Sequence, residues 1–270
     1  MILSTALSTA SLASGWPGLV AATLYAVAAL RGGARERLAA AALPAAWAFH
    51  VLALAFDIGG LGTGGGTRLG FAPVLSLTVW IVIGLHAVES RFVPLPTVRG
   101  WLAPVGVVVT LLAALFPGDS RQFTSPIAAL HFVLGVGAYG LFGAAVVHAA
   151  LLDAAERRLR MKGPGPVGPT GMPLLQLERL TFRFVLVGFG VLSATLLLGM
   201  FSGARWRWDH KAVLSTAGWA VFAALLLGRQ LRGWRGRRAT RWLYIGAVLL
   251  LLAYAGSRFV FEVLLSRPPT

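Results

Sequence analysis

Five histidines, at positions 50, 86, 131, 148 and 210, are the side chains of this sequence best suited to bind a metal. A neutral imidazole is a common metal ligand, and two imidazoles at the same level can ligate one metal, as paired axial ligands do for a haem iron. The chain has no cysteine. That absence excludes disulfides, thiolate metal sites, CxxC redox chemistry and a cysteine nucleophile.

A second group of reactive side chains lies in the stretch ARWRWDHKAVLSTAGW, residues 204–219, between two runs with almost no charge. Two interpretations stay open. Trp206 and Trp208 are either interfacial aromatics or flat surfaces on which a planar, apolar dianion stacks, with nearby cations meeting its carboxylates. Asp209 either contributes to such a site or caps the helix that follows.

The elements that position these residues are membrane-spanning helices. The chain has 270 residues, of which 57% are hydrophobic and only 12% charged, about half the charged fraction of a soluble domain. The charges are bunched between apolar runs of about 20 residues, the length that spans a bilayer. We expect an all-α, polytopic bundle of eight transmembrane helices in one integral domain, residues 1–270. The predicted spans are about 8–30, 37–58, 69–90, 97–117, 125–152, 179–202, 212–229 and 241–265.

The distribution of basic residues predicts the orientation. Of the 24 lysines and arginines, 17 fall in four joints on one side and 7 fall on the other. The longest of these joints, the predicted cytoplasmic loop 153–178, starts with an Arg-rich helix end, which is followed by a Gly/Pro-rich loop. Because cytoplasmic joints are enriched in Lys and Arg, the first side is cytoplasmic and both termini are periplasmic. We therefore attribute the net charge of +15 to loop arginines that set the topology. The expected partner is the lipid bilayer, and we expect no nucleic acid.

Depth separates the histidines. His50 lies ~12 Å and His131 ~9 Å below the predicted outer ends of their spans, at about 1.5 Å per residue. An ionisable side chain at such depth marks a functional site by default, although a hydrogen bond to a neighbouring helix is an equally good explanation. His86 and His148 lie near the cytoplasmic ends of their spans, where the hydrogen-bond interpretation is favoured.

Arg258 lies within the last predicted span, four residues before Glu262. The spacing favours an i,i+4 ion pair on one helix face. The alternative is that Arg258 meets a ligand carboxylate below the outer loop. The run GWRGRR at 233–238 is typical of a positive-inside segment that touches anionic lipid.

The stretch WRWDHKAVLSTAGWAVFAALLLGR resembles the tryptophan-rich signature of the cytochrome c assembly superfamily, whose members handle haem at the outer face of bacterial membranes. There the pattern runs W-x-W-D-P-K-E, then a tryptophan, then leucine-histidine-x-arginine. Matching positions are Trp206, Trp208, Asp209, Lys211, Trp219 and Arg229. Three positions depart: His210 replaces the proline, Ala212 the glutamate, and Leu227 the haem-ligating histidine. The later G-L-H-x-Y-G histidine is also missing, since Gly256-Ser257-Arg258-Phe259 stands there.

Within the superfamily, which includes CcsA-like and CcmC-like proteins, the chain is most similar to the eight-span YpjD/HemX-type inner membrane proteins. FHVLAL around His50, ALHFVLGVGAYG around His131 and LAYAGSRFV near the end carry this resemblance. It implies a multi-pass protein of the bacterial inner (plasma) membrane with a link to haem binding and cytochrome c assembly. By the same resemblance, His131 corresponds to a periplasmic haem histidine, and His50 to a histidine of this branch only.

We therefore expect an accessory protein that holds haem near the periplasmic face. Its cofactor residues are His131 and His50 on the iron, with Trp206, Trp208, Asp209 and Arg258. We do not expect an enzyme, because no nucleophile, acid/base pair or cofactor loop is evident. Other cytochrome c biogenesis subunits are the expected partners.

Two alternatives remain open. The first is a divalent-metal transport or tolerance protein that uses His50, His131 and Asp57. The second is a membrane regulator whose basic cytoplasmic joints bind a haem-biosynthesis enzyme.

Overall fold

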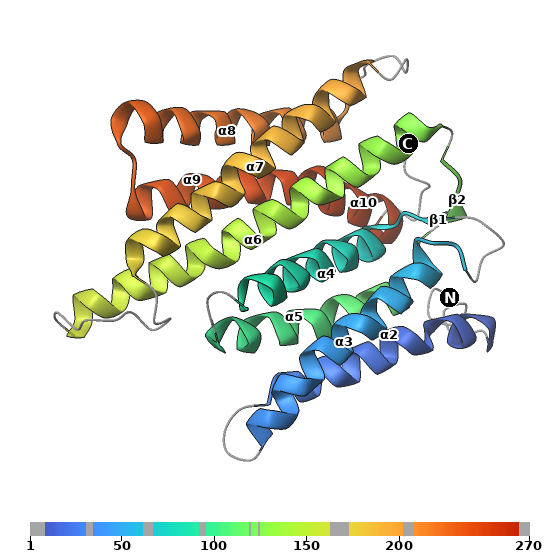
Figure 1. Ribbon diagram of the computed structural model, residues 1–270. Helices are drawn as coiled ribbons and strands as arrows, with labels where there is room; N and C mark the ends of the chain where they lie inside the picture. Colours follow the sequence, from blue (N-terminus) through green and yellow to red (C-terminus); the bar gives the residue numbers. More distant parts are fainter. Residues whose placement is uncertain are drawn as a thin grey trace. The chain divides into compact units, whose positions relative to one another are not determined.

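The computed structural model describes residues 9–30, 35–61, 67–91, 96–118, 120–123, 125–162, 173–201 and 208–264 (Figure 1). The helices are α2 (Thr9–Ala28), α3 (Arg35–Asp57), α4 (Phe71–Glu89), α5 (Pro96–Leu115), α6 (Pro126–Lys162), α7 (Leu174–Phe201), α8 (His210–Arg232), α9 (Gly236–Leu251) and α10 (Ser257–Phe259). Two π-helical turns, Leu252–Gly256 and Val260–Leu264, flank α10, and two short strands, β1 (Thr67–Arg68) and β2 (Ser120–Arg121), pair with each other. Trp206 lies outside the described residues.

The prediction of an all-α polytopic membrane protein is confirmed. Within the described ranges, seven helical stretches are long and apolar enough to cross a membrane. The first predicted span, 8–30, holds a shorter apolar helix, Gly15–Ala28. The periplasmic position of both termini stays a prediction from the charge distribution.

The chain divides into two compact units. Unit 1 comprises Met1–Val88, Pro96–Thr124 and Arg258–Thr270, and unit 2 comprises Glu89–Leu95 and Ser125–Ser257. The sequence-based expectation of one integral domain stays a prediction, and each unit is described by itself.

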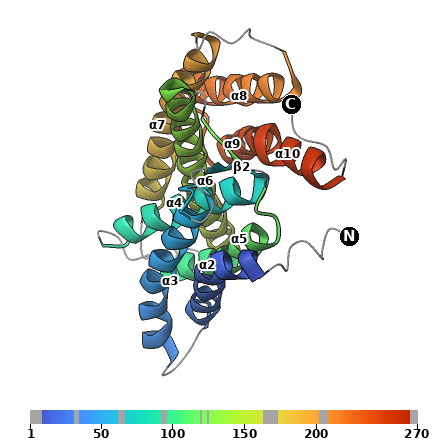
Figure 2. The same ribbon diagram turned by 90° about the vertical axis from the view of Figure 1, so that its right-hand side faces the viewer.

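In unit 1, α2 packs along α3 and also contacts α5, and α2 and α3 lie side by side in both views (Figures 1 and 2). Small side chains such as Ala28, Ala42 and Ala103 form the buried contacts, as expected where helix backbones approach closely in lipid. Trp47 of α3 and Trp80 of α4 stack with ring centroids 4.5 Å apart. Each indole N–H donates to the other residue's backbone carbonyl, at 3.0 and 3.1 Å, so the pair joins the two helices.

A short ladder forms one end of unit 1. Thr67 and Arg68 of β1 pair antiparallel with Arg121 and Ser120 of β2. Next to it the backbone of Gly118, which has a positive φ of 73°, crosses Gly70 so closely that an added Cβ would lie 2.6 Å from the Gly70 Cα. Only glycine fits both requirements, the left-handed backbone and the close crossing.

Unit 2 is built from α6, α7, α8 and α9. Its core contains Phe142 of α6 stacked on Phe222 of α8, with ring centroids 3.9 Å apart. Gly246 of α9 lets that stack approach, because a Cβ there would lie 2.7 Å from the Phe222 ring. The Tyr139 hydroxyl donates to the Leu250 carbonyl at 2.6 Å, just before the π-helical turn. A π turn shifts the backbone hydrogen-bond register, so the tyrosine supplies a partner to a carbonyl at this transition.

Helices α6 and α7 are longer than the predicted spans. The sequence predicted spans at 125–152 and 179–202, whereas α6 continues to Lys162 and α7 begins at Leu174. The run of charges after residue 152 ended the apolar pattern, but Ala, Glu, Arg and Leu are strong helix formers and continue the helix in a polar environment. The extra turns place several arginines on helices.

Gly246→Ala should destabilise unit 2. The new methyl group would overlap the Phe222 ring, which is held by Phe142 and cannot shift freely, and overpacking of this kind costs about 1–3 kcal/mol. We expect a lower melting temperature in detergent. The matched control is Gly190→Ala on α7, where an added Cβ meets nothing within 4 Å. Equal melting temperatures for the two variants would contradict the packing described above.

The predicted orientation is testable because a single introduced cysteine is the only thiol in a chain that has none. Leu61, 67% exposed, follows α3, and Met161, 77% exposed, ends α6. A membrane-impermeant maleimide should label Leu61→Cys in intact spheroplasts and Met161→Cys only after permeabilisation. The reverse pattern would show that the chain is inserted with its termini in the cytoplasm.

Candidate functional site

His50 lies in the interior of unit 1, on α3, with no exposed surface. Its Nδ1 is 3.1 Å from the Tyr25 hydroxyl on α2, and its Nε2 is 2.7 Å from the Ser76 hydroxyl on α4. Both ring nitrogens are therefore engaged, and the ring joins three helices. A metal would have to displace one of these hydroxyl groups to bind His50.

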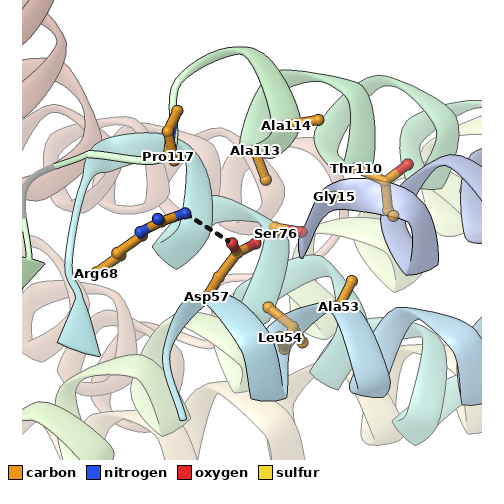
Figure 3. A pocket seen from close by; sticks show the side chains of 11 residues that line it. Gly15, Ala53, Leu54, Asp57, Arg68, Ser76, Thr110, Ala113, Ala114 and Pro117 are labelled. Carbon is orange, nitrogen blue, oxygen red and sulfur yellow. Dashed lines mark ion pairs between the residues drawn. The ribbon is translucent and has the colours of Figure 1, made fainter. Parts of the chain in front are cut away.

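A polar pocket lies beside this group in unit 1 (Figure 3). Its lining includes Ser76, Thr110, Asp57 and Arg68, and the Arg68 guanidinium is 3.8 Å from the Asp57 carboxylate. The space available to the centres of water molecules is about 30 Å³, enough for one or two waters. The pocket is therefore too small for a porphyrin.

His131 has a different environment in unit 2. It lies in the second turn of α6, its side chain is exposed, and its Nδ1 is 3.1 Å from the backbone carbonyl of Thr195 on α7. A carbonyl only accepts, so Nδ1 carries the proton and the neutral ring presents the lone pair of Nε2. A histidine held through one nitrogen by a carbonyl, with the other available, has the arrangement typical of metal-ligating histidines.

The same part of α7 also holds an aromatic side chain of α8. The Trp219 indole donates from Nε1 to the Ser193 hydroxyl at 2.8 Å and stacks on Phe189, with ring centroids 5.5 Å apart. Ser193 and Thr195 thus connect α7 to α8 and to α6 within one turn. These contacts fix the backbone that orients His131.

The described residues just before α8 include its N-cap. Asp209 is the N-cap of this helix: its backbone is extended, and its carboxylate accepts from the Ala212 N–H at 2.8 Å. The capping interpretation made from the sequence is confirmed. Trp208, the residue before the cap, is 69% exposed, and His210 is the first residue of α8. Trp206 and the rest of 202–207 lie outside the described residues.

His148 shows the hydrogen-bond role favoured from the sequence. In unit 2 its Nδ1 is 2.7 Å from the Ala144 carbonyl, and its Nε2 is 2.8 Å from Glu89 Oε1. Because a carbonyl only accepts, Nδ1 donates to Ala144, and Nε2 forms the second hydrogen bond with the Glu89 carboxyl group. His86, on α4 in unit 1, is buried.

Arg258 forms the ion pair expected from its spacing. Its Nη1 is 3.2 Å from Glu262 Oε1, and the other carboxylate oxygen of Glu262 accepts from the Phe71 N–H at the start of α4, at 3.2 Å. In unit 1, Glu262 therefore caps α4 from a distant part of the chain while it neutralises Arg258. A role of Arg258 in ligand binding stays a prediction.

The candidate residues fall into both units: His50, Asp57 and Arg258 belong to unit 1, and His131, Trp208 and Asp209 to unit 2. In the described part of the chain, no three His, Cys, Asp or Glu side chains form a group that could hold a metal ion. Sequence reasoning missed the residues that hold the histidine rings. Tyr25 and Ser76 were detectable as lone polar residues in apolar runs, whereas the Thr195 backbone carbonyl leaves no signal in the sequence.

Two substitutions at Asp209 distinguish the effect of its capping hydrogen bond from the effect of its negative charge. Asp209→Ala removes the acceptor for the Ala212 N–H and should cost about 1 kcal/mol of stability, whereas Asp209→Asn keeps an N-cap of similar strength and should leave the melting temperature unchanged. Thermal unfolding in detergent measures both. If the asparagine variant is as unstable as the alanine variant, the negative charge itself is needed.

Comparison with known proteins gives the family. The model of the family Cytochrome C assembly protein matches residues 17–265. An uncharacterised 28.8 kDa protein of Azospirillum brasilense is 32% identical over 237 residues, 82% of each chain. The inner membrane protein YpjD of Escherichia coli K12 is 32% identical over 176 residues, 62% of this chain and 66% of YpjD.

The cytochrome c biogenesis protein CcsA of Parasynechococcus marenigrum is 27% identical over 216 residues, 67% of this chain and 71% of CcsA. No solved structure matches at a significant level. The similarity to YpjD and the apolar helices indicate a multi-pass inner membrane protein. Because the family model covers nearly the whole chain, this protein belongs to the cytochrome c assembly protein family and has a role related to cytochrome c biogenesis.

Proposed function

We propose that this protein holds haem near the periplasmic face of the membrane, with His131 as a ligand to the iron. The observation that carries the proposal is the hydrogen bond from His131 Nδ1 to the Thr195 carbonyl. It fixes the ring orientation and the tautomer, and it directs the basic nitrogen Nε2 away from α7. The side chain is exposed rather than enclosed, so a large planar ligand can approach it.

Unit 2 also carries aromatic side chains that suit such a ligand. Trp219 and Phe189 stack in the same unit, and the exposed Trp208 begins the segment that leads into α8. Indole faces pack well on an extended apolar ring system. A bound haem would supply an iron centre with open coordination positions, and the residues of this chain bind it, orient it and limit its contact with water.

His50 fits the same role less well. Its two nitrogens are already bonded to Tyr25 and Ser76, and the adjoining pocket has room for one or two waters only. We therefore assign iron ligation to His131 and helix joining to His50.

An accessory role, without catalysis, is part of the proposal. The resemblance to the superfamily signature covers its tryptophans, while leucine stands at 227 and arginine at 258, near the places where the superfamily has haem histidines. A protein with fewer histidine ligands suits haem holding better than haem transfer through several sites. Covalent attachment of haem to an apocytochrome then falls to other biogenesis subunits, and the relative named as the cytochrome c biogenesis protein CcsA supports this setting.

The test is an absorption spectrum of the protein purified in detergent, with haem quantified as its pyridine complex. The wild-type protein should show a Soret band, and His131→Ala should weaken or shift it strongly. The matched control is His210→Ala, which removes the other histidine of the periplasmic side of unit 2. If His131→Ala retains the wild-type spectrum and haem content, His131 is not a ligand.

A further inference from the structure

One end of unit 2 carries a dense group of exposed arginines. At this end α6 and α8 finish while α7 and α9 begin (Figure 1). The group consists of Arg157, Arg158, Arg160, Arg179, Arg183, Arg232, Arg235, Arg237, Arg238 and Arg241, all of them exposed. We call this group the arginine collar.

The four helix ends are held together by acidic side chains that point inward. Asp153 of α6 accepts from the Thr240 and Tyr244 hydroxyls of α9, at 3.0 and 2.9 Å. Glu178 of α7 binds Arg229 of α8 at 2.6 Å, and the Arg229 guanidinium also lies over the Phe182 ring. These contacts hold the helix ends, and therefore the backbone positions of the collar arginines, relative to one another.

The acids at this end do not neutralise the collar. The Glu89, Glu156 and Glu178 side chains are 10%, 22% and 11% exposed. Glu89 pairs with His148, and Glu178 pairs with Arg229, which is not in the collar. Among the ion pairs of the described residues, Glu156 alone binds a collar arginine, Arg160. Residues 210–261 contain no acidic residue. Positive charge is thus left on the outside of all four helix ends.

Exposed apolar side chains lie among the arginines. Leu175, 61% exposed, precedes Arg179 by four residues on α7, and Leu231, 76% exposed, precedes Arg232 on α8. A stripe of leucine followed by Arg179 and Arg183 on one helix face suits the boundary between acyl chains and headgroups, where long arginine side chains reach from the apolar layer to the polar one.

From this arrangement we propose that the arginine collar binds anionic phospholipid headgroups of the cytoplasmic leaflet. Guanidinium groups match phosphate in geometry and charge, and clusters of four to eight basic residues next to a transmembrane helix attract anionic lipid. An acidic soluble protein is the competing partner. The lipid fits better because the charge surrounds four helix ends at the apolar boundary and is mixed with exposed leucines.

The experiment measures thermal unfolding of the full-length protein in detergent during titration with phosphatidylglycerol or phosphatidylcholine. The variant Arg179→Gln/Arg183→Gln/Arg237→Gln/Arg241→Gln removes four collar charges that have no part in the inward pairs. The matched control carries lysine at the same four positions and keeps the charge. Wild-type protein and the lysine control should be stabilised by phosphatidylglycerol and much less by phosphatidylcholine. For the same rise in melting temperature, the glutamine variant should need at least about tenfold more phosphatidylglycerol than the wild-type protein.

A measurement on the wild-type protein alone tests the proposal even if the glutamine variant does not fold. Raising the salt concentration should weaken the phosphatidylglycerol effect, because headgroup attraction is screened. Equal stabilisation by the two lipids, or an unchanged response in the folded glutamine variant, would overturn the proposal. Equal stabilisation by soluble polyglutamate would overturn it too, in favour of an acidic protein partner.

Discussion

No water is available in the hydrocarbon layer to satisfy a side-chain donor or acceptor, so each polar group there must find its partner within the protein, on its own helix or on a neighbouring one. In unit 1 this requirement joins α2, α3 and α4 through Tyr25, His50 and Ser76. In unit 2 it joins α6 to the π-helical end of α9 through Tyr139 and the Leu250 carbonyl. Packing of alanine and glycine then brings the helices close enough for these bonds to form.

The hydrogen bonds also distinguish His50 from His131, for both of which the sequence predicted the same role as iron ligands. At similar predicted depth, His50 uses both nitrogens to hold unit 1 together, whereas His131 uses one and presents the other. The difference lies in the partners. The hydroxyl groups of Tyr25 and Ser76 engage both nitrogens of His50, whereas the Thr195 carbonyl engages one nitrogen of His131. A ligand can therefore bind His131 without a loss of helix contacts.

Local features of the fold were predictable from the sequence, and contacts between distant segments were not. The apolar runs gave the spans, the sequence W-D-H-K gave the cap at Asp209, and i,i+4 spacing gave the Arg258–Glu262 pair. The second contact of Glu262, with the Phe71 N–H, joins residues 191 positions apart, and no local pattern predicts it. The Arg-rich helix end predicted after residue 152 is confirmed, since α6 continues to Lys162, and only the apolar span had been placed shorter because hydropathy ends with the apolar layer while helix propensity does not.

The charged side chains of unit 2 follow the same rule, because the acidic groups are paired inside the unit and the unpaired arginines among its described residues are exposed. The acids of unit 2 near the arginine collar point inward to Thr240, Tyr244, Arg229 and His148, and the surplus arginines face outward. Composition gives 24 lysines and arginines against 9 acids, and the ion pairs show which of the described arginines are neutralised by an acid. The polar groups that join the helices already have their partners within the fold, whereas the groups proposed to bind a ligand or lipid have unused capacity.

The most direct test of His131 as the iron ligand is chemical rescue. His131→Gly, purified in detergent with haem added, should lack the wild-type Soret band, and free imidazole should restore it by occupying the position of the missing ring. The account predicts restoration by imidazole and none in His210→Gly, which should keep its spectrum throughout. A His131→Gly protein whose spectrum equals that of the wild type, with no response to imidazole, would contradict it.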